Sequence, residues 1–208
     1  MHMMRRGKYG SFRTLNRTEQ EGRDYRKVVE DRGTDMVILA PHGGEMEPGT
    51  SEVAQALAGT DLSLYCFESL KGEHGRRLHI TSVQFDEPEC IVLVRQAETV
   101  VAIHGCQGDE AIVYVGGLDE ALIGKLIGAL ETAGFDAQED NSHHAGNSVE
   151  NICNRGRSGQ GVQLELSTGL RRTMFSEPTW WRREATTAVF DRFVGAVKVV
   201  LLTEREES

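Results

Sequence analysis

The stretch from Met36 to Glu52, MVILAPHGGEMEPGTSE, constrains the fold more than any other part of the chain. It opens with five apolar residues, Met36–Ala40, which predict a short strand that is buried on both faces. Pro41 ends this run, and a Gly-Gly pair then allows a tight turn. A helix is expected from Thr50, as its N-cap, to Ala58. A buried strand, a glycine turn and a helix indicate an open α/β sheet.

One histidine and two carboxylates lie on this turn. His42 follows the strand directly, and Glu45 and Glu47 come within the next five residues. Ligands of open α/β sheets bind at the carboxyl ends of the strands, and an imidazole with a carboxylate is a typical pair of zinc ligands. The alternative is a polar strand-to-helix loop with a solvated histidine. This stretch alone does not distinguish the two interpretations.

A second buried strand ends with the same pair of residues. Thr99–Cys106 reads TVVAIHGC, so His104 is followed by glycine, as His42 is. Alone, His104 is best interpreted as a hydrogen-bonded histidine at the sheet edge. Together with His42 and a carboxylate it becomes a third zinc ligand, which leaves an open position for water.

Another candidate residue lies inside a strand. Val162–Leu166 alternates between apolar and polar residues, and Glu165 lies on its polar side. A glutamate in the middle of a strand is costly unless it is paired or faces a cleft. We therefore favour a catalytic carboxylate over an edge-strand glutamate.

Weaker patterns predict the remaining elements. Leu122, Leu126 and Leu130 form the apolar stripe of a helix that Gly134 ends, and Asp86 is expected to cap another helix as part of a capping box with Glu89. Residues 139–161 form a long polar segment, which is usually functional or mobile in a compact domain. Strands are expected at residues 24–29, 62–67, 78–82 and 112–115, and a C-terminal helix at residues 190–201.

Size and charge limit the classes of function. The 208 residues predict one domain over residues 1–208, with residues 1–8 disordered. A net charge of -9 argues against a nucleic-acid-binding protein, and an anionic substrate would need a local cluster of arginine or lysine. We expect no signal peptide and no membrane span, and hence a protein that is cytoplasmic as synthesised, with release on host lysis left open.

The four cysteines do not suggest a structural zinc knuckle. None of them falls in a CxxC motif, and reduced thiols are expected. A bridge between Cys106 and Cys153 is left open, because sequence does not show proximity.

Six strings, taken together and in this order, resemble the phage-type poly-γ-glutamate hydrolases, some of which carry the name phage-related replication protein. The resemblance runs from about Tyr9 to the C-terminal helix. Any one string would be weak evidence, whereas their joint order is specific. The strings are APHGGEMEPGTSE at 40–52, LHITS at 78–82, IHGC at 103–106, VGGLD at 115–119, NICNRG at 151–156 and GVQLELSTGLR at 161–171.

The resemblance implies a three-layer α/β/α fold with a central mixed sheet, similar to zinc metallocarboxypeptidases. It implies that Zn²⁺ is held by His42, Glu47 and His104, with Glu165 as the general base. Glu45 departs from the family pattern, which mostly has a small residue there, and it recreates the His-x-x-Glu spacing of true metallocarboxypeptidases. We assign Glu47 as the ligand because it precedes Pro-Gly-Thr-Ser, as the family's glutamate does.

The implied reaction is hydrolysis of a γ-glutamyl amide by zinc-activated water. Poly-γ-glutamate has a free α-carboxylate beside every scissile bond, and Arg155 and Arg171 are the candidates to bind it bidentately. Two alternatives are a zinc amidase for another γ-glutamyl or acyl-amino-acid substrate and a non-catalytic phage accessory protein. The acidic charge argues against the second, and we expect a monomer.

Overall fold

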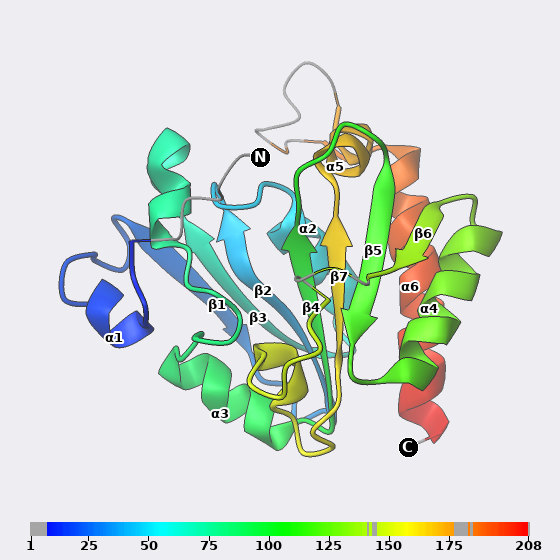
Figure 1. Ribbon diagram of the computed structural model, residues 1–208, viewed down its shortest axis with the longest axis horizontal. Coiled ribbons are helices and arrows are strands. Elements are labelled where there is room, and N and C mark those ends of the chain that lie inside the picture. The colour runs from blue at the N-terminus through cyan, green and yellow to red at the C-terminus, as the bar shows by residue number, and fades with distance from the viewer. Residues whose placement is uncertain (1–7, 141, 143–144, 177–182, 184, 208) are drawn as a thin grey trace.

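A seven-stranded mixed sheet forms the centre of the molecule, with helices on both faces (Figure 1). The computed structural model describes residues 8–140, 142, 145–176, 183 and 185–207. The sheet has the order β1-β3-β2-β4-β7-β5-β6. Its strands are β1 (Tyr25–Glu30), β2 (Met36–Gly44), β3 (Ser63–Ser69), β4 (Thr99–Gly105), β5 (Ile112–Gly117), β6 (Asp136–Glu139) and β7 (Val162–Leu166).

Two apolar cores lie on opposite faces of this sheet. One core joins the sheet to α2, α4, α5 and α6, and the other joins it to α1, α3 and η2. This arrangement confirms the expected α/β/α layers. The helices are α1 (Phe12–Leu15), α2 (Thr50–Ala58), α3 (Pro88–Gln96), α4 (Glu120–Thr132), α5 (Thr168–Met174) and α6 (Ala188–Glu207), with short 3-10 helices η1 (Gly72–Leu78) and η2 (Ile152–Asn154).

The four central strands β3, β2, β4 and β7 are parallel, so their carboxyl ends meet at one edge of the sheet. β1 pairs antiparallel with β3, and β5 pairs antiparallel with β7. β2 and β4 carry buried residues almost throughout, as the apolar runs in the sequence predicted. The residues that end β2, β4 and β7 are therefore brought together by strand pairing alone.

Several local predictions were wrong. The strand expected at 78–82 is absent, because Leu78 ends η1 and no strand follows it. α3 is capped by Glu87, whose side chain accepts from the Cys90 amide, while Asp86 accepts from the distant Phe12 amide. The N-cap of α2 is Gly49 with φ 101°, so Thr50 is already helical. The sequence patterns also missed α1, α5 and β6.

Three further expectations concern the cysteines, the N-terminal segment and membrane spans. All four cysteines are free thiols, so the bridge between Cys106 and Cys153 is not formed. Residues 1–7 of the expected disordered segment lie outside the described residues, and the Lys8 amide donates to the Arg77 carbonyl at 3.2 Å. No helix in the described part of the chain is both long and apolar enough to cross a membrane.

Leu126 tests the core between the sheet and α4. It is fully buried, so Leu126→Ala is expected to lower the free energy of unfolding by about 2–5 kcal/mol, through lost burial and a cavity. Val199→Ala on α6 is the control, because Val199 is 68% exposed and should change stability by about 0.5 kcal/mol or less. Urea unfolding of both variants measures the difference, and equal midpoints would contradict this packing.

Candidate metal centre

His42 lies near the end of β2, where the backbone passes very close to α2. The pairing of β2 with β3 shifts between Ala40 and Gly43, and His42 falls inside this irregular part. A Cβ at Gly43 would lie 2.0 Å from Ser51 Oγ in the first turn of α2. The glycine therefore allows the helix to approach the strand while the buried His42 imidazole points to the other face.

Three ligand-type side chains converge at this edge of the sheet. His42 Nδ1 lies 3.1 Å from His104 Nδ1 and 3.3 Å from Glu47 Oε1. His104 Nδ1 lies 3.7 Å from Glu47 Oε2. The strands β2 and β4 supply the two imidazoles, and the turn before α2 supplies the carboxylate.

Hydrogen bonds outside this group orient its members. His42 Nε2 donates to the Ile80 carbonyl at 2.6 Å, which leaves a lone pair on Nδ1. The Gly105 amide donates to Glu47 Oε2 at 2.9 Å. His104 Nε2 lies 3.4 Å from Ser82 Oγ. Two imidazole nitrogens and a carboxylate that face one another at these distances fit a bound cation, and this donor set suits zinc.

Burial and neighbouring charge shift the pKa values in opposite directions. Burial raises the pKa of Glu47, but the charges of His42 and His104 and their hydrogen bonds outweigh it and hold that pKa well below its usual value. Burial raises the pKa of Glu165 to about 7, opposed by the charge of His104. Two carboxylates in one site thus differ strongly in proton affinity.

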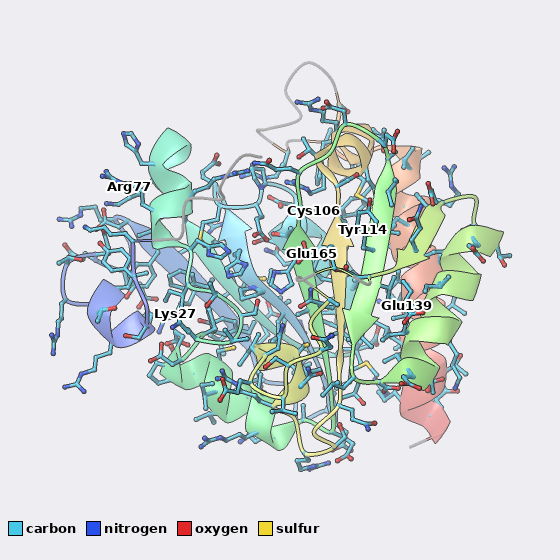
Figure 2. All side chains as sticks on the ribbon, viewed as in Figure 1. Lys27, Arg77, Cys106, Tyr114, Glu139 and Glu165 are labelled. Carbon is cyan, nitrogen blue, oxygen red and sulfur yellow. The ribbon has the colours of Figure 1, made fainter. Side chains whose placement is uncertain are left out.

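Glu165 lies beside His104 in the sheet. The two residues are partners in the pairing of β4 with β7, and Tyr114 of β5 is the partner of Glu165 on the other side. Paired residues have their side chains on the same face, so the three form a row across the sheet. Figure 2 shows Glu165 and Tyr114 on neighbouring strands at the centre of the molecule. Gln163 Nε2 donates to Glu165 Oε1 at 3.3 Å.

His79 is a site residue that the sequence interpretation missed. Its ring stacks on His42 with centroids 3.9 Å apart, and its Nε2 lies 3.8 Å from Glu47 Oε1. His42, Glu47 and His79 also form a group whose ligand atoms lie within 4.8 Å of one another. His79 is more exposed than His104, at 32% against 3% of the side chain. The LHITS string held the signal, but it was interpreted as a strand.

Glu45 lies apart from the imidazoles. Its Oε1 pairs with Arg183 Nη2 at 3.0 Å, and Arg183 Nε also pairs with Glu52 at 2.6 Å. The contacts with His42, His79 and His104 all come from Glu47. The geometry therefore favours Glu47 over Glu45 as a ligand.

Arg155 and Arg171 point their guanidinium groups at backbone carbonyls. Arg155 makes four donations, to the carbonyls of Val83, Phe85 and Glu150. Arg171 is 2% exposed and donates to Leu166, Pro48 and Cys106 carbonyls and to the Thr168 hydroxyl. A guanidinium has five N–H groups, so each arginine keeps one. Neither presents the paired donors that bidentate carboxylate binding needs.

Comparison with known protein families identifies the relatives of this chain. The model of the poly-gamma-glutamate hydrolase family matches residues 9–196. The UPF0714 protein YndL of Bacillus subtilis (strain 168) is 39% identical over 169 residues, which are 80% of this chain. This chain spans 66% of the length of YndL.

Solved structures give the same relationship. A bacteriophage poly-gamma-glutamate hydrolase superposes with a TM-score of 0.93 at 30% identity, over 97% of this chain and 100% of that one. A zinc-free apo form of YndL has a TM-score of 0.90 at 34% identity, over 95% and 98% of the two chains. N-formylglutamate amidohydrolase from Ralstonia eutropha JMP134 shares only the fold, with a TM-score of 0.56 at 11% identity over 88% and 98%. The chain belongs to the poly-γ-glutamate hydrolase family.

Proposed function

We propose that this protein is a zinc-dependent hydrolase that cleaves the γ-glutamyl amide bonds of poly-γ-glutamate. The observation that carries the proposal is the convergence of His42 Nδ1, His104 Nδ1 and the Glu47 carboxylate beside the half-buried Glu165. Membership of the family supports the substrate, and the zinc-free form of the related YndL supports the metal.

His42, Glu47 and His104 would hold the zinc. When bound, zinc polarises the scissile carbonyl and lowers the pKa of water. The backbone supports the ligands, since Ile80 fixes the His42 ring and the Gly105 amide fixes one oxygen of Glu47. His79 stacks on His42 at the more exposed side of this ligand group.

Glu165 would act as the general base. Its carboxylate is held by burial at a pKa near 7, so it can both accept and return a proton close to neutral pH. Its position beside His104 in the pairing of β4 with β7 supports proton removal from water and delivery to the leaving amine. Gln163 orients one carboxylate oxygen from the same strand.

Arg155 and Arg171 have structural roles in this proposal. Arg155 ties the segment that carries Val83 and Phe85 to the loop at Glu150. Arg171 joins the carbonyl of Pro48, beside Glu47, to that of Cys106 at the end of β4. Through these bonds Arg171 holds the two ligand-bearing segments at a fixed separation.

The metal ligands are tested by zinc content. We expect about one zinc per chain in the parent protein. Glu47→Gln, His42→Ala and His104→Ala should each lose metal affinity by more than about a hundredfold, since changes outside the ligand shell already cost 10–100-fold. Glu45→Gln is the matched control, because Glu45 pairs with Arg183 instead. Loss of zinc from the Glu45 variant but not from the Glu47 variant would refute this assignment.

The base is tested by Glu165→Gln. The amide has nearly the same shape but accepts no proton at neutral pH, so zinc content and melting temperature should stay unchanged while the rate falls at least about a hundredfold. The measurement is the chain length of poly-γ-glutamate after incubation with either protein. Glu131→Gln, an exposed change on α4, is the control. A variant that loses zinc or unfolds would make Glu165 a structural or ligand carboxylate.

Arg171→Lys separates the structural role from substrate binding. A lysine cannot reproduce four divergent donations, so we expect a loss of about 2–4 kcal/mol in unfolding free energy, with the exposed Arg172→Lys as control. Thermal unfolding measures this loss. An unchanged melting temperature with a raised KM would return Arg171 to the role of carboxylate binder.

A further inference from the structure

The proposed substrate needs a cation that the arginines considered so far do not provide. Every residue of poly-γ-glutamate has a free α-carboxylate, and this chain has a net charge of -9. Arg155 and Arg171 are engaged with backbone carbonyls, and Arg183 lies between Glu45 and Glu52. Binding of an anionic polymer therefore requires another positive group near the metal centre.

Arg76 lies in the last turn of η1, beside the metal centre. Its carbonyl accepts the His79 amide at 3.3 Å, so the position of η1 and that of the His79 ring are linked. The preceding residue, Gly75, packs against the turn that carries the ligands, since a Cβ there would lie 2.6 Å from the Glu45 carbonyl oxygen. This close contact holds η1 against the segment between His42 and Glu47.

The guanidinium of Arg76 is available to a ligand. Arg76 is exposed, and no ion pair among the side chains that the structure describes includes it. Its positive charge lowers the pKa of both His79 and Arg171, after the larger effects of His42 on the first and of burial on the second. The hydrogen bond from the His79 amide to the Arg76 carbonyl places this exposed arginine at the edge of the metal centre.

The neighbouring Arg77 lies on the side of η1 that is away from the metal centre. Figure 2 shows Arg77 on the outer side of η1, away from Glu165. Its backbone carbonyl accepts from the Lys8 amide, on the side of the N-terminal segment. Arg77 therefore provides a matched control with the same charge and the same helix.

We propose that Arg76 binds the free α-carboxylate of the glutamyl residue at the scissile bond and so determines specificity for anionic γ-glutamyl chains. This inference rests on the proposed hydrolase function. Two parallel N–H groups of a guanidinium fit a carboxylate bidentately, and the exposed Arg76 is bonded through its backbone to His79, the more exposed histidine of the site. The positive charge of Arg76 offsets the net negative charge of the protein at the point where the polymer binds.

The test uses two γ-linked glutamate oligomers of equal length, one with free α-carboxylates and one with α-carboxamides. Arg76→Ala should lower kcat/KM for the free-acid oligomer at least about tenfold. The same change should leave kcat/KM for the carboxamide oligomer unchanged. Arg76→Lys should recover only part of the loss, and Arg77→Ala should match the parent. Zinc content and melting temperature should not change in any variant.

Binding without turnover provides a second readout. In the Glu165→Gln background, calorimetry should show weaker binding of the free-acid oligomer when Arg76→Ala is added. An equal loss on both oligomers, or a loss of zinc, would overturn the proposal for Arg76. A zinc-loaded parent protein that cleaves neither oligomer would refute the proposed function instead, and calorimetry would still decide whether Arg76 binds the carboxylate.

Discussion

The close approach of two imidazole nitrogens, 3.1 Å between His42 Nδ1 and His104 Nδ1, is the constraint on which the site depends. Two lone pairs at this distance repel each other unless a proton or a cation lies between them, and the Glu47 carboxylate faces the same point. Parallel pairing of β2 with β4 creates this geometry, because it brings both strand ends to one edge of the sheet. The polar site is thus a direct result of the apolar core beneath it.

Glycines allow the backbone to support the site at close range. A Cβ at Gly105 would lie 2.8 Å from Arg171 Cζ and 3.1 Å from Glu47 Cβ, so any larger residue would displace one of them. The Gly105 amide also donates to Glu47. Gly105 therefore leaves space for the Arg171 side chain, and its amide also donates a hydrogen bond to the Glu47 carboxylate. The glycine that follows each of the two histidines in the sequence is therefore required for steric reasons.

The parts that sequence predicted are those fixed by local pattern. β2 and β4 were recognisable from apolar runs that end in His-Gly, and β7 from its alternation of apolar and polar residues. These three strands carry His42, His104 and Glu165. The hydrogen-bond partners of side chains were not predictable where the partner is a backbone carbonyl far away in the sequence. Arg155 reaches Val83 and Phe85, and Arg171 reaches Pro48, across separations that no periodicity encodes. His79 was missed because its stack on His42 depends on η1, which no sequence pattern predicted.

The site also joins segments that are far apart in the chain. His42 and His104 are 62 residues apart, and Glu47 lies on the turn between β2 and α2. An ion held by all three closes this long loop of chain without a covalent bond, and a ligand that binds only the folded state shifts the folding equilibrium by mass action. A metal ion bound at this site would therefore also stabilise the folded sheet. The concentration of available metal would then affect the stability of the folded protein as well as its proposed activity.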